Sequence, residues 1–252
     1  MVSPLELERE LNQLLSPEKF KDYAPNGLQV ASGRPITDII SGVSATQALI
    51  DVAIEKDAQA ILVHHGYFWK GEDPRIIGMK YQRIKRLLDH DIGLFAYHLP
   101  LDAHPVLGNN AELARLLGIS VTDGMDRGNP YSVGNVGEFD EPMTGQQLAD
   151  RLNAVLARPP IHIDAPGRPI RSVAWCTGGA QGYIEQAIEC GVDAYITGEA
   201  SEQTTHVARE YGIHFYAAGH HATERYGIQA VGRYVADKFN INHQFIDIDN
   251  PV

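Results

Sequence analysis

The stretch Ile36–His65, ITDIISGVSATQALIDVAIEKDAQAILVHH, decides the fold. The β-branched segment Ile36–Val43 is typical of a strand, Gln47–Glu55 is typical of a helix, and Ala60–Val63 reads as a second, buried strand. This second strand is expected to stop at a pair of histidines. A strand, a helix and a further strand in this order predict an α/β protein with a mainly parallel sheet.

The same order recurs 134 residues later. Residues 170–199 can be laid on residues 36–65 without a gap. The identical positions are Ile36, Gln47, Ile50, Ala53, Ile54, Glu55 and Ala60, which match Ile170, Gln181, Ile184, Ala187, Ile188, Glu189 and Ala194. A repeat with matched strand, helix and strand indicates an internal duplication. We therefore expect two similar α/β lobes with mainly parallel mixed sheets and a cleft between them.

The remaining patterns place further elements around this frame. They predict helices at Pro4–Leu15 (with Ser3 as N-cap), Tyr81–Leu88, Thr144–Leu156 and Thr223–Phe239, and strands at Leu94–Tyr97, Val133–Phe139, Phe215–Ala218 and within residues 241–252. The Gly-, Asp- and Asn-rich segment Asp123–Asn135 is the expected linker. The expected domains are residues 1–125 plus 219–252, carrying most of the candidate ligands, and residues 126–218.

Composition narrows the class of protein. The 252 residues are 44% hydrophobic, which is enough for a stable core without disulfides. Lys and Arg number 21 and Asp and Glu 32, giving a net charge of −11, which disfavours a nucleic-acid coat protein. No apolar run approaches the roughly 18 residues of a membrane helix, and the N-terminus does not resemble a signal peptide. With two cysteines only, the chain is expected in the reducing cytoplasm.

The 11 histidines are clustered at the ends of predicted strands. His64 and His65 end one apolar strand, and His98 and His104 bracket Asp102 after the next. In open α/β sheets, ligands bind beyond the carboxyl ends of the strands. Taken singly, paired loop histidines that only form hydrogen bonds, or an aspartate that caps a turn, would explain these residues equally well.

A third cluster, Gly219–Arg225, follows the strand Phe215–Ala218. His220 and Glu224 are four residues apart, which puts them on one face of a helical turn. The alternative for Glu224 is a first-turn acid that the helix dipole stabilises. Together the three clusters bring imidazoles and carboxylates to one predicted sheet edge, and we expect a metal centre there.

Two other motifs are open to more than one interpretation. Tyr67, Trp69 and Lys70 beside the paired histidines could stack on a ring substrate and meet a phosphate, or could simply pack a loop. The Gly-rich loop Cys176–Gly182 could bind a phosphate through its backbone, although a tight turn is favoured. Glu199 ends the strand that the repeat equates with the one bearing the paired histidines, and could line the opposite side of the cleft.

At this point the motifs resemble a known family. The segments DYAPNGLQV, VHHGYFWKGE, HLPLDAHP, WCTGG and FYAAGHHATER are similar to those of the GTP cyclohydrolase 1 type 2 homologues, the Nif-three-like proteins, in their short form. The resemblance spans essentially the whole chain. It implies a two-lobed α/β fold, a homohexameric ring and two divalent ions per subunit. The implied ligands are His64, His65, Asp102, His220 and Glu224, with Glu224 shared between the ions.

These expectations predict a metal-dependent hydrolase that opens the purine ring of GTP or a related nucleotide. Glu199, His98 and His104 are candidate proton carriers, and Lys70 or Arg75 could meet the triphosphate. Nitrogen and oxygen ligands admit zinc, iron, manganese or nickel. Two alternatives remain, a metal-dependent nucleotide phosphohydrolase and a non-catalytic metal-binding or adaptor protein. The expected partners are other copies of this chain and a nucleotide-like small molecule, with no membrane; the net charge disfavours nucleic acid without excluding a local basic patch.

Overall fold

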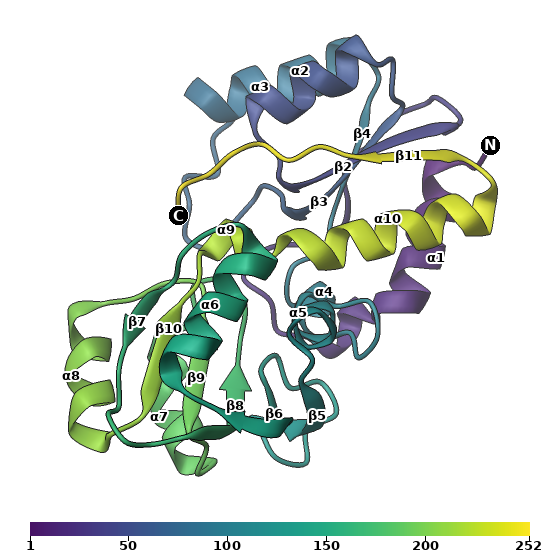
Figure 1. Cartoon of the computed structure of the whole chain (residues 1–252). Coiled ribbons are helices and arrows are strands. Elements are labelled where there is room, and N and C mark those ends of the chain that lie inside the picture. The colour runs from purple at the N-terminus through teal and green to yellow at the C-terminus, as the bar shows by residue number, and fades with distance from the viewer. The chain divides into compact units, whose positions relative to one another are not determined.

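The computed structural model describes residues 1–252, which divide into two compact units. Unit 1 consists of Met1–Leu101 and Gly227–Asp249, and unit 2 of Asp102–Tyr226 and Asn250–Val252. Each unit contains one mixed β-sheet covered by helices (Figure 1). The expected α/β class is therefore confirmed. No helix is both long and apolar enough to cross a lipid bilayer.

Unit 1 is built on a five-stranded sheet in the order β1-β4-β3-β2-β11. The strands are β1 (Gly27–Val30), β2 (Asp38–Ser44), β3 (Ala60–His65), β4 (Gly93–Ala96) and β11 (Asn242–Phe245). All neighbouring pairs are parallel except β1 with β4. The helices are α1 (Pro4–Leu15), the short 3-10 turn η1 (Pro17–Lys19), α2 (Gln47–Glu55), α3 (Gly78–Asp89) and α10 (Arg225–Phe239). Figure 1 shows α2 and α3 on one face of this sheet and α10 with α1 on the other.

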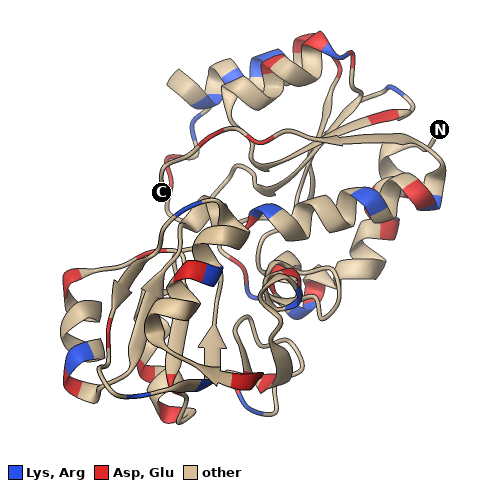
Figure 2. Cartoon of the chain, in the orientation of Figure 1, with Lys and Arg blue, Asp and Glu red and all other residues tan.

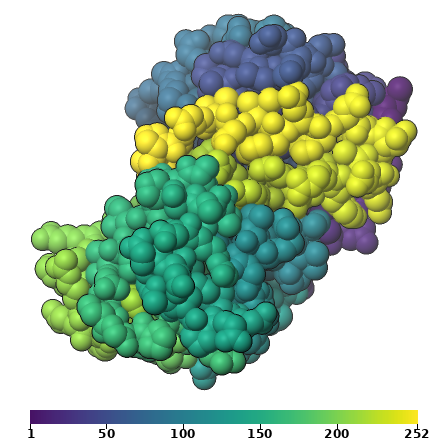
Figure 3. Space-filling view, in the orientation of Figure 1, coloured from purple at the N-terminus to yellow at the C-terminus, as the bar shows by residue number.

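The local sequence explains why these elements form. Helix α1 begins as predicted, because Ser3 Oγ accepts a hydrogen bond from the N–H of Glu6. Strand β3 is buried on both faces, and its alternate residues Ile61 and Val63 join the core formed with α2. The central strands carry few charged residues, which lie on the helices and loops instead (Figure 2). The C-terminal segment, yellow in Figure 3, covers part of unit 1 beside the blue residues of α2.

Unit 2 is built on a six-stranded sheet in the order β5-β6-β8-β9-β10-β7. The strands are β5 (Ser120–Gly124), β6 (Asn135–Met143), β7 (Ile161–Ile163), β8 (Ile170–Trp175), β9 (Ala194–Thr197) and β10 (His214–Ala217). Only β8–β9 and β9–β10 are parallel pairs. The expectation of a mainly parallel sheet is therefore wrong for this unit, because β5, β6 and β7 join its edges in antiparallel pairs.

The helices of unit 2 cover both faces of its sheet. They are α4 (Leu99–Ala103, which crosses from unit 1), α5 (Asn109–Leu117), α6 (Gly145–Leu156), the 3-10 turn η2 (Gln181–Tyr183), α7 (Ile184–Glu189), α8 (Glu202–Tyr211) and α9 (His220–Thr223). Alternate residues of β8 face opposite ways: Val173 and Trp175 pack with α5 and α6, while Ala174 packs with α7 and α8. The predicted N-cap of α6 is confirmed, because Thr144 forms a capping box with Gln147.

The two segments aligned in the sequence fold alike. In β2 and β3, Ile39 pairs with Ala60, and in β8 and β9, Val173 pairs with Ala194, which is the same pair of positions shifted by 134. Both strand pairs are parallel and are joined by a helix. The equal register explains why the sequence patterns match; the duplication itself stays an interpretation of that match.

The unit boundaries differ from those expected at residues 125 and 218. The chain passes from unit 1 to unit 2 after Leu101 and returns after Tyr226. The first boundary comes earlier because β5 pairs with β6, which takes α5 and β5 into unit 2. The expected linker, Asp123–Asn135, is therefore the hairpin connection of that pair.

Candidate metal centre

Three histidines gather at one end of the unit 1 sheet. His64 and His65 end β3, and His98 follows the parallel neighbour β4. One ring nitrogen from each lies within 4.8 Å of the other two. The ring centroid of His64 is 4.5 Å from that of His65 and 5.1 Å from that of His98. We call these residues the unit 1 histidines.

Hydrogen bonds orient the rings of the unit 1 histidines. His64 Nδ1 lies 2.9 Å from the carbonyl oxygen of Tyr97, and His98 Nδ1 lies 2.6 Å from Asp22 Oδ1. Because a carbonyl or carboxylate oxygen can only accept, both Nδ1 atoms carry the proton and both Nε2 atoms carry the lone pair. Histidines that bind metals are commonly held in this way, by a carbonyl or carboxylate on the second ring nitrogen.

Two buried carboxylates lie in unit 2. Asp102 on α4 is 5% exposed, and Glu224 at the end of α9 is 3% exposed. One carboxylate oxygen of each lies within 4.8 Å of the other. Asp102 Oδ1 accepts hydrogen bonds from Asn109 Nδ2 at 2.8 Å and from Thr177 Oγ1 at 3.3 Å.

His220 completes this arrangement, and we call Asp102, His220 and Glu224 the unit 2 ligand group. His220 Nε2 lies 3.3 Å from Glu224 Oε2, so the predicted spacing of four residues does bring both side chains together. His220 Nδ1 lies 2.6 Å from Glu199 Oε1. Burial alone would lower the pKa of His220, but Glu224 and Glu199 outweigh it and raise this pKa to about 9. The arrangement of carboxylates thus stabilises positive charge at this point.

Gly178 lets the chain approach the unit 2 ligand group closely. A Cβ at this position would lie 2.1 Å from Glu224 Oε1 and 3.1 Å from His220 Nε2, and the φ of Gly178 is +73°. Its N–H donates to Thr223 Oγ1 at 3.0 Å. The Gly-rich loop therefore forms a tight turn that fits around the carboxylate.

Site residues of both units lie next to two of the three points where the chain passes between the units. The first crossing, between Leu101 and Asp102, falls between two site residues, His98 of unit 1 and Asp102 of unit 2, which are four positions apart in the sequence. The second crossing comes after Tyr226, two residues beyond Glu224. The prediction of one sheet edge is wrong, however, because His64, His65 and His98 follow strands of the five-stranded sheet and His220 follows β10 of the six-stranded sheet.

The three candidate proton carriers have different surroundings. Glu199 accepts a hydrogen bond from His220, and His98 is one of the unit 1 histidines. His104 Nδ1 accepts hydrogen bonds from the N–H groups of Val106 and Leu107, and burial lowers the pKa of His104. Their part in a reaction stays a prediction.

The three candidate substrate residues also differ. Tyr67 is buried in the core of unit 1 and donates a hydrogen bond to the carbonyl oxygen of Ala45, so its ring serves packing. The Trp69 ring lies edge-on to His98, with centroids 5.0 Å apart. Lys70 has an exposed side chain on the same loop.

Two residues around the site had no role in the sequence-based prediction. Asp22 bonds His98 through its side chain, and Asn26 Oδ1 accepts from the N–H of His98. Both belong to the DYAPNGLQV segment, residues 22–30, which carries part of the family resemblance but no predicted ligand. Only the resemblance of that segment to the family could have pointed to these two residues. Asn26 and Asp22 are 72 and 76 residues away from His98 in the sequence, so no local pattern links them to it.

Comparison with known proteins identifies the family of the chain. Residues 5–251 match the family model described as Duf34/NIF3 (NGG1p interacting factor 3). A Pseudomonas aeruginosa protein named GTP cyclohydrolase 1 type 2 homolog is 57% identical over 246 residues, 97% of either chain. A solved structure described as protein ybgI, of unknown function, is 50% identical with a TM-score of 0.95 over both full chains. A structure from Thermus thermophilus is 31% identical with a TM-score of 0.89, also over both full chains. The chain belongs to the Duf34/NIF3 family.

Proposed function

We propose that this protein is a metal-dependent hydrolase in which both units hold one dinuclear centre. His64 and His65 from unit 1 would bind the ions together with Asp102, His220 and Glu224 from unit 2. Glu224, with two oxygens on one buried carboxylate, would contact both ions. Zinc, iron, manganese and nickel suit this mixture of nitrogen and oxygen donors.

The observation that carries the proposal is where the ligands lie along the chain. Two of the three crossings between the units fall within two residues of a buried carboxylate, Asp102 at the first and Glu224 at the second. The donor set itself fits metal ions, because the hydrogen bond from His64 Nδ1 to Tyr97 leaves the His64 Nε2 lone pair for an ion and the acids present oxygens. The glycine at position 178 keeps a Cβ away from Glu224. A compact group of carboxylates and imidazoles of this kind is costly to bury without a cation.

Two divalent ions about 3.5–4 Å apart, when bound, would acidify a water molecule and stabilise negative charge on a substrate oxygen. The chain contributes the positioning. Glu199 holds the His220 ring through Nδ1, and Asp22 does the same for His98. We assign Glu199 and His98 the exchange of protons with the substrate or solvent, because both border the ligands.

We propose a purine nucleotide such as GTP as the substrate class. The names of the curated relatives support this, since they are homologues of GTP cyclohydrolase 1 type 2. Water would add twice to the carbon that lies between the two nitrogens of the five-membered purine ring. Each addition would be followed by cleavage of one bond from that carbon to nitrogen, and the carbon would leave as formate. Trp69 is placed beside the histidines where it could stack on the base, and Lys70 and Arg75 could meet the phosphates.

The test is product analysis with GTP on the full chain supplied with each candidate metal. Formate release supports the proposal, whereas release of inorganic phosphate alone would replace it by a nucleotide phosphohydrolase. The absence of both products with metal bound would support a binding or adaptor role.

A variant of Glu224 tests whether any observed turnover takes place at the proposed metal centre. Glu224→Gln keeps the shape of the side chain but removes its charge, so turnover should fall by more than the roughly 10–100-fold expected for loss of an outer partner. Glu210→Gln, an exposed residue at the end of α8, is the matched control and should keep full turnover. If Glu224→Gln keeps wild-type turnover while circular dichroism shows an intact fold, the reaction does not take place at the proposed dinuclear centre.

A further inference from the structure

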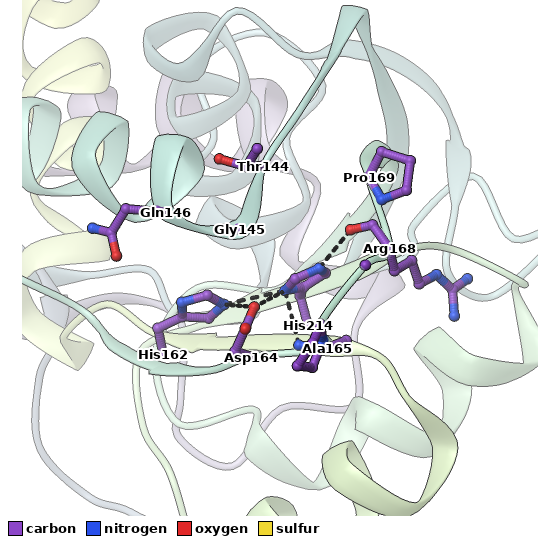
Figure 4. A pocket seen from close by; sticks show the side chains of 11 residues that line it. Thr144, Gly145, Gln146, His162, Asp164, Ala165, Arg168, Pro169 and His214 are labelled. Carbon is purple, nitrogen blue, oxygen red and sulfur yellow. Dashed lines mark hydrogen bonds and ion pairs between the residues drawn. The ribbon is translucent and has the colours of Figure 1, made fainter.

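A second group of titratable residues lies in a cavity of about 490 Å³ in unit 2 (Figure 4). His162, Asp164 and His214 point into this cavity under the start of α6. His214 begins β10, whereas His220 follows the other end of that strand. The cavity is therefore separate from the unit 2 ligand group.

Strand register brings these residues to one face. β7 and β10 are antiparallel, with His162 opposite Tyr216 and Ile163 opposite Phe215. Since alternate residues share a face, His162 lies diagonally across from His214. Asp164, the first residue after β7, continues on the same face.

The distances within the group match those around a tetrahedral metal ion. His162 Nε2 lies 3.2 Å from His214 Nδ1, and Asp164 Oδ1 lies 3.3 Å from His214 Nδ1 and 3.8 Å from His162 Nε2. Zinc bonds to nitrogen and oxygen of about 2.0–2.2 Å place neighbouring ligands of a tetrahedron roughly 3.3–3.5 Å apart. The three atoms are thus within a few tenths of an ångström of a zinc-binding arrangement.

The rings are held in place by their surroundings. His214 Nε2 donates to the carbonyl oxygen of Arg168 at 2.9 Å, so the lone pair of the buried His214 ring is on Nδ1, where it accepts a hydrogen bond from the N–H of Ala165 at 3.3 Å. An ion in the cavity would take the place of this long hydrogen bond. The His162 ring stacks on Tyr216, with centroids 4.4 Å apart and an angle of 8° between the planes. A Cβ on Gly145 would lie 2.7 Å from both imidazole rings, so glycine allows α6 to begin directly over them.

Apart from the two histidines themselves, no lysine or arginine of the cavity lining pairs with Asp164. The one Lys or Arg in that lining is Arg168, and its guanidinium donates instead to Asp193 and to the carbonyl oxygens of Gly212 and Val192. Figure 4 shows this side chain extending away from the histidines. A carboxylate beside two imidazole nitrogens, without a guanidinium to pair it, favours a cation as the occupant.

We propose that His162, Asp164 and His214 form a mononuclear site for a zinc-class divalent ion, independent of the dinuclear centre. Three protein ligands leave a fourth position of the tetrahedron open toward the cavity. Zinc sites of this open kind bind water or a small ligand in that position. The shallow placement of Asp164, whose side chain is 57% exposed, suits an ion that exchanges with solution.

The test counts zinc ions in the full chain after stripping with a chelator and dialysis against buffered Zn²⁺. Asp164→Asn and His162→Gln should each bind one Zn²⁺ fewer per chain than the wild type. Asp140→Asn, an exposed residue of the same unit with the same change in charge, should bind as many as the wild type. With Co²⁺, the visible absorption of one tetrahedral nitrogen- and oxygen-bound ion should disappear in the first two variants.

Glu224→Gln separates this site from the dinuclear centre, because that variant should keep the ion bound by His162 and Asp164. If Asp164→Asn and His162→Gln, folded by circular dichroism, bind the same number of Zn²⁺ ions as Asp140→Asn over the whole buffered range, the proposal is overturned. The contacts between the two histidines would then be ordinary hydrogen bonds.

Discussion

Gly178 is the residue whose lack of a side chain leaves room for the carboxylate of Glu224 in the unit 2 ligand group. We expect Gly178→Ala to lose metal affinity, because its Cβ would lie 2.1 Å from Glu224 Oε1 and must displace the carboxylate. Alanine at a positive φ also costs roughly 1–2 kcal/mol of stability. Metal content and the free energy of unfolding, measured together, separate the two effects.

Gly128→Ala is the control for backbone strain. Gly128 also lies in unit 2 and has a φ of +79°, but nothing lies within 4 Å of the Cβ that alanine would add. It should lose similar stability and keep its metal. Equal metal content in both variants would mean that Gly178 does not shape the site.

At the residue scale, sequence patterns identify ligands more readily than the groups that hold them. Histidines at the ends of apolar strands are visible along the chain, and so is the spacing between His220 and Glu224. The contact of Asp22 with His98 is not visible, because it depends on tertiary folding across 76 residues. Within unit 1 the structure brings His64, His65 and His98 together, and within unit 2 it brings Asp102 and His220 to Glu224. That His64 and His65 bind the same ions as the unit 2 ligand group stays a proposal.

Strand β11 provides a test at the scale of elements, because it carries a half-buried histidine. His243 Nε2 lies 2.7 Å from Ser41 Oγ on the neighbouring strand β2. Burial, followed by the charge of Arg233, lowers the pKa of His243 from 6.5 to about 4. Only the unfolded chain therefore takes up this proton between about pH 6.5 and pH 4.

Stability should consequently fall as the pH drops through that range. The contribution of neutral His243 is complete above pH 6.5 and is lost progressively toward pH 4, with a slope of up to about 1.4 kcal/mol per pH unit. Denaturant unfolding at a series of pH values measures it. In His243→Gln the plot of unfolding free energy against pH should be flatter, by the slope that corresponds to about one proton. An unchanged slope in that variant would show that other groups cause the pH dependence.

Elements with strong local signals were predicted well. Helices α1 and α2 have the predicted bounds, because caps at Ser3 and Thr46 and apolar spacing define them locally. Pairing partners were not predictable in the same way. The sequence predicts a linker at Asp123–Asn135, where the connection between β5 and β6 lies, since a loop rich in Gly, Asp and Asn suits both a linker and a turn.

At the scale of the whole molecule, the resemblance to the family predicts a homohexameric ring. Light scattering coupled to size-exclusion chromatography should give a mass about six times the 27.7 kDa of one chain. A mass of one or two chains over a wide concentration range would contradict this prediction and would restrict the catalytic proposal to residues of a single chain.

The central claim is that both units bind the same pair of ions. Anomalous diffraction from crystals of the metal-loaded protein tests it most directly. We predict two peaks about 3.5–4 Å apart, surrounded by His64, His65, Asp102, His220 and Glu224. Separate peaks that contact only the ligands of one unit, or no peak beside Glu224, would contradict the account.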